Sequence, residues 1–242
     1  GHGAGCRGNK LSAFASEIDN DHEILTASDV PERLNRGIIA IGRYGSIRDD
    51  IDAFAAGASD VPSGELCLCS DGMWPTELVS EGYMDAVVRR AIDAGIDPAC
   101  AFKMVTLNAA RHLGLPGRGS LSPGSIADAV VLSDPESVAV RTVVSSGSVV
   151  VRDGVVLADD QPFEYPEPIK DSIHIEVPED RFRIAAGETG PVFAIEYDEG
   201  LISKQVTVDP PVVDGKLRAA PDRDLLTAAL IPRCPDQQDG GF

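Results

Sequence analysis

Two histidines and one carboxylate lie in polar, turn-like surroundings where their side chains could bind a metal. His2 stands between two glycines, and His22 lies in the run Asn-Asp-His-Glu at 20–23. Asp71 follows the apolar run 66–69. Two imidazoles and a carboxylate are ligands for a divalent ion that activates water. The residues therefore indicate a metal site, with a helix N-cap as the alternative role of Asp71.

The elements that position these residues alternate between strand and helix patterns. Apolar runs at 37–42 and 65–69 are bounded by glycine, serine and aspartate, which is typical of strands buried on both faces of a parallel sheet. A helix pattern at 47–56 separates them. This order favours a parallel sheet or barrel, in which active sites lie at the carboxyl ends of the strands. We expect His2, His22 and Asp71 at such strand ends.

The pattern changes along the chain at Gly114. Before it we predict helices at 10–18, 77–81, 83–94, 98–105 and 107–113. After it, we predict short strands at 127–132, 140–145, 149–152 and 155–157, the last two joined by the turn dipeptide Asp153-Gly154. An acidic segment with prolines at 159–168 is a predicted linker. Beyond it, strand patterns occur at 173–177, 182–184, 192–197 and 205–208.

Composition excludes several classes of protein. The chain carries 39 acidic and 21 basic residues in 242, a net charge of −18 that opposes binding to nucleic acid or anionic lipid. No apolar run approaches the roughly 20 residues that span a bilayer, and no secretory signal pattern opens the chain. Five cysteines without framework spacing indicate reduced thiols. We expect a cytoplasmic protein with neither nucleic acid nor a membrane as partner.

The remaining histidines and the closest cysteines fit structural roles. His112 falls on a predicted helix face and His174 in a predicted strand. Cys67 and Cys69 are two residues apart on one predicted strand, so their side chains point to the same face of a buried strand. Core packing is therefore the expected role of both. The Pro-Cys-x-x-Cys motif of the cytidine and tRNA-adenosine deaminases is absent from the sequence.

Several motifs together carry a family resemblance. Residues 1–5, 20–23 and 69–72 resemble Gly-His-Ala-Pro-Gly, Ser/Asn-Asp-His-Glu and Cys-Thr-Asp-Asp of the adenine deaminase family in the amidohydrolase superfamily. Further matches lie at 81–85 (Glu-Gly-Tyr-Met-Asp), 106–110 (Thr-Leu-Asn-Ala-Ala) and 119–128, where superfamily members return from the barrel into a small β domain. Residues 220–226 resemble the C-terminal domain of that family.

The resemblance implies a fold and a domain division. The fold class would be α/β, the C-terminal part of a metal-dependent (β/α)8 barrel followed by a small β unit and a further β-rich (α+β) domain. Residues 1–114 would form the C-terminal half of the barrel, 115–160 a segment of the small β domain, and 169–242 an incomplete C-terminal domain. Because the His-x-His pair and bridging carboxylate of the family match no residue here, we expect the chain to be a fragment.

The resemblance also implies an enzyme of purine salvage that hydrolyses adenine to hypoxanthine and ammonia. His2, His22 and Asp71 would be metal ligands of a binuclear centre, with manganese or iron expected and zinc as the alternative. Asp71 would also move the proton of the attacking water, and Glu23 would contact the purine or orient the site. The partner would be a small purine base, with a homo-oligomer left open.

Departures from the family motifs keep two other functions open. Gly72 replaces the second aspartate of Cys-Thr-Asp-Asp, Tyr83 replaces a histidine, and Ala4 replaces a proline. The first alternative is another amidohydrolase-superfamily deaminase or a cyclic amidase, since related sites differ mainly in their pockets. The second is a non-catalytic truncated remnant or binding module.

Limited proteolysis tests the predicted linker. We expect the first cut within 159–168, because that segment offers few apolar side chains to anchor it. Mass spectrometry of the earliest fragments locates the cut. A first cut between residues 83 and 113, with the acidic segment intact, would contradict the predicted domain division.

Overall fold

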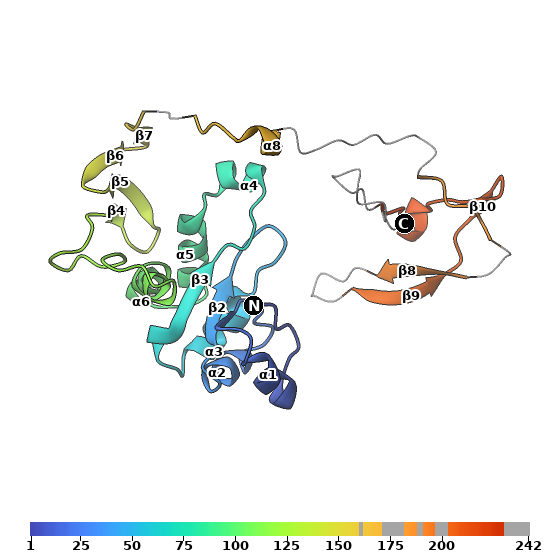
Figure 1. The fold of residues 1–242 in the computed structure, drawn as a ribbon, viewed down its shortest axis with the longest axis horizontal. Helices are drawn as coiled ribbons and strands as arrows, with labels where there is room; N and C mark the ends of the chain where they lie inside the picture. The colour runs from blue at the N-terminus through green and yellow to red at the C-terminus, as the bar shows by residue number, and fades with distance from the viewer. Residues whose placement is uncertain (160–161, 171–181, 188–190, 197–202, 230–242) are drawn as a thin grey trace. The chain divides into compact units, whose positions relative to one another are not determined.

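The computed structural model divides into two compact units, Gly1–Asp160 and Gln161–Phe242, each described here by itself. The structure describes residues 1–159, 162–170, 182–187, 191–196 and 203–229 (Figure 1). Within these ranges, no helix has both the length and the apolar character needed to cross a bilayer. The three-part domain division expected from the sequence stays a prediction.

A parallel three-stranded sheet forms the centre of the first unit. Its order is β1 (Asn20–Asp21), β2 (Ile39–Arg43) and β3 (Leu66–Cys69), with both pairs parallel. The helices between these strands are α2 (Asp29–Leu34) and α3 (Ile51–Ala58), and α1 (Gly8–Phe14) precedes them. The alternation of strand and helix expected from the sequence is confirmed for this sheet. A short 3-10 turn, η1 (Ser63–Glu65), leads into β3.

Buried side chains from the sheet and its helices form one core. Ala40, Leu66 and Leu68 project from the strands and meet helical side chains that include Phe54 of α3. Gly42 permits this contact, because a Cβ there would lie 2.6 Å from the Phe54 ring. Glycine at this position therefore allows β2 and α3 to approach closely.

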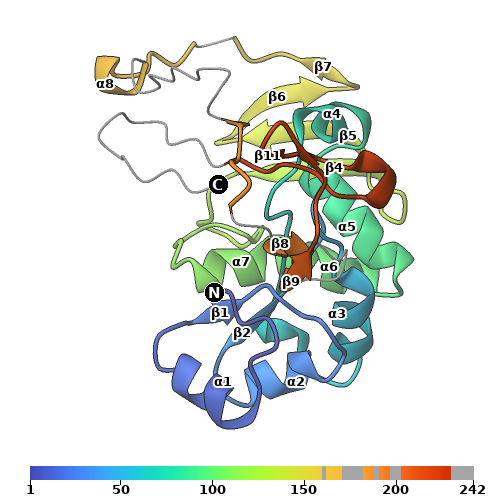
Figure 2. The same cartoon turned by 90° about the vertical axis from the view of Figure 1, so that its right-hand side faces the viewer.

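Four helices follow the sheet, as the sequence predicts. They are α4 (Pro75–Ser80), α5 (Met84–Asp93), α6 (Pro98–Val105) and α7 (Leu107–His112). Val87, Val88 and Ala91 of α5 are buried, and α6 begins with Pro98 after Asp97, whose carboxylate accepts a hydrogen bond from the Cys100 amide. That side chain and the proline define the helix start, because both satisfy or remove unpaired N–H groups. Both α5 and α6 contact β3, and the two helices lie next to each other (Figure 2).

The rest of the first unit is an antiparallel sheet. Its strands, in spatial order, are β4 (Ala129–Asp134), β5 (Ala139–Ser145), β6 (Ser148–Arg152) and β7 (Val155–Val156). Asp153 and Gly154 join β6 to β7 with φ of 48° and 80°, the left-handed pair that a tight hairpin turn requires. The four predicted strands are confirmed within one or two residues at each end.

The second unit contains two described hairpins. β8 (Val192–Glu196) pairs with β9 (Lys204–Val208), and β10 (Val212–Val213) pairs with β11 (Lys216–Leu217). α8 (Glu167–Lys170) begins within the predicted linker, and η3 (Pro221–Arg223) follows the hairpins. The strand predicted at 182–184 is wrong: the backbone there is 3-10 or irregular, and the pairing seen next to it among the described residues is an isolated bridge at Ala185. The strand predicted at 173–177 lies outside the described residues.

Phe54→Ala tests the core between sheet and helices. Phe54 is fully buried, so removal of its ring leaves a cavity beside Gly42 and should lower the free energy of unfolding by about 3–5 kcal/mol. Val79→Ala is the control, because Val79 is 88% exposed and its truncation should change stability by less than about 0.5 kcal/mol. Urea denaturation measures both. Equal effects from the two variants would show that the Phe54 ring is not packed as described.

Candidate metal and hydrolysis site

Strand ends bring most of the predicted site residues to one edge of the parallel sheet. His22 directly follows β1, and Asp71 comes two residues after β3. His2 lies in an irregular segment that runs beside β1, where the Gly1 amino group donates to Asn20 Oδ1 at 2.9 Å. The edge is the carboxyl end of the sheet, where ligands bind in open α/β structures.

The two histidines are in contact. Their ring centroids are 4.6 Å apart with the planes at 79°, an edge-to-face arrangement. His22 Nε2 is buried and has no hydrogen-bond partner among the described residues. Burial lowers the pKa of His22 below its usual value, and the nearby Arg43 guanidinium lowers it further. Neutral imidazole with an unpaired nitrogen is the form that binds a metal, so this pair fits a divalent ion.

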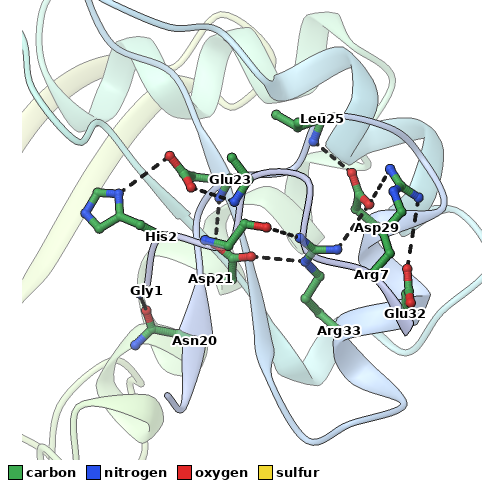
Figure 3. Close-up of polar contacts among 12 residues, drawn as sticks. Gly1, His2, Arg7, Asn20, Asp21, Glu23, Leu25, Asp29, Glu32 and Arg33 are labelled. Atoms are coloured by element: carbon green, nitrogen blue, oxygen red, sulfur yellow. Dashed lines mark hydrogen bonds and ion pairs between the residues drawn. The ribbon is translucent and has the colours of Figure 1, made fainter. Parts of the chain in front are cut away.

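Glu23 joins the His2 segment to the turn after β1. Its Oε2 accepts a hydrogen bond from the Ala4 amide at 2.7 Å, and its Oε1 lies 3.5 Å from His2 Nδ1 (Figure 3). Burial alone would raise the pKa of Glu23, but the Ala4 hydrogen bond and His2 outweigh it and lower that pKa. Glu23 is therefore a carboxylate at neutral pH. An anion beside Nδ1 orients the His2 ring and leaves Nε2 for a metal.

Asp71 is held by an arginine at the neighbouring strand end. Arg43, the last residue of β2, has a nearly buried side chain whose Nη1 donates to Asp71 Oδ2 at 2.7 Å. Asp71 has a φ of 60°, in the left-handed region, and its side chain is 47% exposed. The N-cap role considered for Asp71 is wrong, because α4 begins at Pro75 and Trp74 occupies the N-cap position.

Alternating charges connect Asp71 to Glu23. Arg43 Nη2 also pairs with Asp50 Oδ2 at 3.0 Å, and Asp50 Oδ1 receives Arg48 Nη2 at 2.9 Å. Arg48 Nη1 in turn lies 3.6 Å from Glu23 Oε1. The network spans the ends of β1, β2 and β3, so the side chains near His22 and near Asp71 are electrostatically coupled.

The three expected ligands are not gathered at one point. Among the described residues, no group of three or more His, Cys, Asp or Glu side chains is placed to hold a metal ion. His2 and His22 lie together, whereas the carboxylate of Asp71 lies against Arg43. Within the described ranges, a metal would therefore find two imidazole ligands and nearby carboxylates, and not a closed shell.

Two arginines that organise this edge were not predicted from the sequence. Arg43 ends β2 and Arg33 lies on α2, and both side chains are buried against carboxylates. Arginine at the end of an apolar strand run was the available signal for Arg43. For Arg33 the only signal was its i,i+4 spacing from Asp29 on a short helix, which is common on exposed helix faces as well.

His112, Cys67 and Cys69 have the surroundings expected of structural residues. His112, at the end of α7, has its Nε2 2.9 Å from Asn20 Nδ2, and among the described residues no ring contact joins it to either ring of the histidine pair. His174 lies outside the described residues. Cys67 is buried in β3, and both Cys67 and Cys69 have their thiol pKa raised by burial.

A family model and curated relatives point to the same family. The model of the amidohydrolase family matches residues 18–150. An adenine deaminase of Methanothrix thermoacetophila is 30% identical over 235 residues, which cover 96% of this chain and 41% of the relative. An adenine deaminase of Nitratidesulfovibrio vulgaris is 34% identical over 176 residues, 72% of this chain and 30% of the relative. The chain thus spans about two fifths or less of these curated relatives.

A solved structure shares the fold. The beta-aspartyl dipeptidase of Fervidobacterium islandicum AW-1, in complex with a beta-Asp-Leu dipeptide, aligns with a TM-score of 0.51 at 21% sequence identity. The alignment covers 67% of this chain and 48% of the dipeptidase. At this level of identity the likeness concerns the fold alone, which agrees with the mixed α/β structure described above.

Alkylation of the Cys67 thiol tests the burial of β3. Burial raises the pKa of its thiol to about 11, so at pH 8 only about one molecule in a thousand carries the reactive thiolate. Iodoacetamide should therefore label Cys67 at least ~10-fold more slowly than the partly exposed Cys6. Peptide mass mapping over time measures both rates. Equal labelling rates would contradict the packing of β3.

Proposed function

The chain belongs to the amidohydrolase family, and from that premise we propose that it serves the hydrolytic deamination of adenine to hypoxanthine and ammonia. The observation that carries the proposal is the contact between His2 and His22 at the carboxyl edge of a parallel sheet. The Nε2 atom of His22 is buried there and has no hydrogen-bond partner among the described residues. Similarity to relatives named adenine deaminase, over 96% of this chain, supports adenine as the substrate.

His2 and His22 are the residues we propose to hold a divalent metal ion. Their donor set of two imidazoles, with carboxylates nearby, suits iron or zinc as well as manganese. We propose manganese or iron in a binuclear centre, with zinc as the alternative. A bound divalent ion would supply Lewis acidity, which lowers the pKa of a water molecule toward neutrality.

Asp71 is the proposed proton carrier. Hydrolysis adds water at C6 of adenine and releases the amino group as ammonia, so one proton must leave the water and one must reach the departing nitrogen. A carboxylate can do both in turn. The Arg43 hydrogen bond at 2.7 Å fixes the position of Asp71 Oδ2 at the rim. Glu23 is proposed to act beside it by orienting His2, through the 3.5 Å contact with Nδ1.

The proposed setting follows from the substrate and the charge. A free purine base is the partner, and the reaction belongs to purine salvage in the cytoplasm. The net charge of −18 repels nucleic acid, which supports a small neutral base as the ligand. Thiols such as Cys67 would remain reduced there.

Asp71→Asn and His22→Ala test the two roles in the protein expressed from its complete gene and loaded with Mn²⁺. Asp71→Asn should lower adenine turnover on the order of 10²-fold while metal content stays near the parental value, because only the proton acceptor is lost. His22→Ala should lower metal content itself. Ammonia release and hypoxanthine formation measure turnover, and elemental analysis measures metal.

Matched controls separate these roles from general damage. Asp52→Asn removes an exposed carboxylate that also pairs with an arginine, and His112→Ala removes a histidine outside the pair. Both should keep turnover and metal. Full activity in Asp71→Asn would place the proton acceptor elsewhere. A metal-loaded parent that does not deaminate adenine but hydrolyses a cyclic amide would favour a different amidohydrolase activity. A parent that neither binds metal nor turns over substrate would favour a binding module.

A further inference from the structure

We propose that Arg33 is a positioning residue for the histidine pair, acting through Asp21 and the backbone of Gly3 and Glu23, the residues that follow His2 and His22. The inference rests on the proposed function, because it treats these two side chains as the ligands. Arg33 touches neither imidazole. It fixes the two chain segments that carry them, which are 20 residues apart in sequence and come from different elements.

The Arg33 guanidinium reaches three partners from the buried face of α2. Its Nε donates to Asp21 Oδ2 at 3.1 Å, its Nη1 to Asp29 Oδ1 at 3.1 Å, and its Nη2 to the Gly3 carbonyl oxygen at 2.9 Å (Figure 3). The side chain is fully buried, as are Asp21 and, within 1%, Asp29. One planar group therefore joins the end of β1, the start of α2 and the segment that carries His2.

Asp21 extends this contact to the residues flanking both histidines. Its Oδ1 accepts hydrogen bonds from the amides of Gly3 and Glu23, each at 3.1 Å. Gly3 follows His2, and His22 lies between Asp21 and Glu23. The Glu23 side chain closes the loop by accepting from the Ala4 amide at 2.7 Å. The backbone amide that follows each histidine is thus bound to one carboxylate that Arg33 holds.

Gly3 makes the close approach of the two segments possible. A Cβ at this position would lie 2.2 Å from Asp21 Oδ2 and 3.3 Å from the Phe14 ring. Any side chain there would displace the carboxylate from Arg33 or the segment from β1. The glycine beside His2 is therefore part of the same device and does not serve only as a flexible turn.

The charges of the cluster are balanced, which lets it remain buried. Arg33 faces two carboxylates, and Arg7, whose side chain is 44% exposed, adds a second positive charge at 2.8 Å from Asp29 Oδ1. Burying ion pairs is costly, and a well-packed apolar cluster of the same size often stabilises a fold at least as well. What an apolar cluster cannot supply is directional hydrogen bonding to a chosen carbonyl and carboxylate. A lysine could not supply it either, because its single ammonium lacks the planar fork.

Two variants and one control test the proposal in the protein expressed from its complete gene. Arg33→Lys keeps the charge and removes the fork, and Gly3→Ala disturbs the same cluster without touching α2 or the core. Arg36→Lys is the matched control, because Arg36 lies just after the C-cap of α2 and donates to Ser12 and Gly8 of α1 and to the Glu32 carbonyl of α2. Circular dichroism and thermal melting verify that each variant is folded.

The direct measurement needs no metal. Ring protons of His2 and His22 are close enough in the parent to give a nuclear Overhauser effect, given a centroid separation of 4.6 Å. We expect this effect to disappear in Arg33→Lys and in Gly3→Ala, and to remain in Arg36→Lys. Titration with Zn²⁺ should show affinity lowered by about 10-fold or more in the first two variants, since loss of the groups that orient ligands typically costs that much.

The outcomes separate this proposal from the proposed function. A ring-to-ring effect that persists in folded Arg33→Lys or Gly3→Ala would overturn the positioning role, as would an equal loss in Arg36→Lys. If Arg33→Lys does not fold, Gly3→Ala decides by the same criterion. A parent that shows the nuclear Overhauser effect between the two rings but binds no Zn²⁺ would contradict the proposed metal site. The ring-to-ring measurement on the variants would still test the positioning role of Arg33.

Discussion

β2 and β3 run parallel with Arg43 opposite Cys69, so the chain leaves both strands at the same edge of the sheet. β1 joins β2 in the same sense, which adds the turn that carries His22 to that edge. Parallel strands need long crossovers, here built around α2 and α3, and these crossovers cover the sheet with the apolar side chains of the core. Every polar contact at the site depends on this arrangement, because residues far apart in sequence become neighbours only where strands end together.

The polar edge is assembled from arginines set among carboxylates in a strongly acidic chain. Arg43 and Arg48 alternate with Asp71, Asp50 and Glu23, so each carboxylate near the proposed site has a cation within about 4 Å. Such pairs contribute little at an exposed surface, but the Arg43 side chain is nearly buried and its hydrogen bonds are correspondingly stronger. Within this network, Arg43 holds the Asp71 carboxylate at the end of β3.

A second cluster, centred on Arg33, controls a different part of the same edge. It binds backbone groups and carboxylates beside the histidines, whereas the Arg43 network binds the side chain of the proposed proton carrier. The two clusters meet at Glu23, which contacts His2 and also lies 3.6 Å from Arg48. The proposed metal ligands and the proposed proton carrier are therefore coupled through Glu23, although each also has contacts of its own.

Local pattern was sufficient for much of this protein. Buried strands at β2 and β3, the helical block from α4 to α7, and the Asp153-Gly154 hairpin follow from periodicity and turn chemistry, and the motifs around His2, His22 and Asp71 indicated the family. The tertiary structure alone decided which charged groups meet. It placed Arg33 beneath the histidine segments, paired Arg43 with Asp71, and left 182–184 without a strand, since strand formation there depends on a partner that local sequence does not specify. Periodicity reports which face of an element is apolar, whereas ion pairs between residues 20 or more apart depend on how those elements pack.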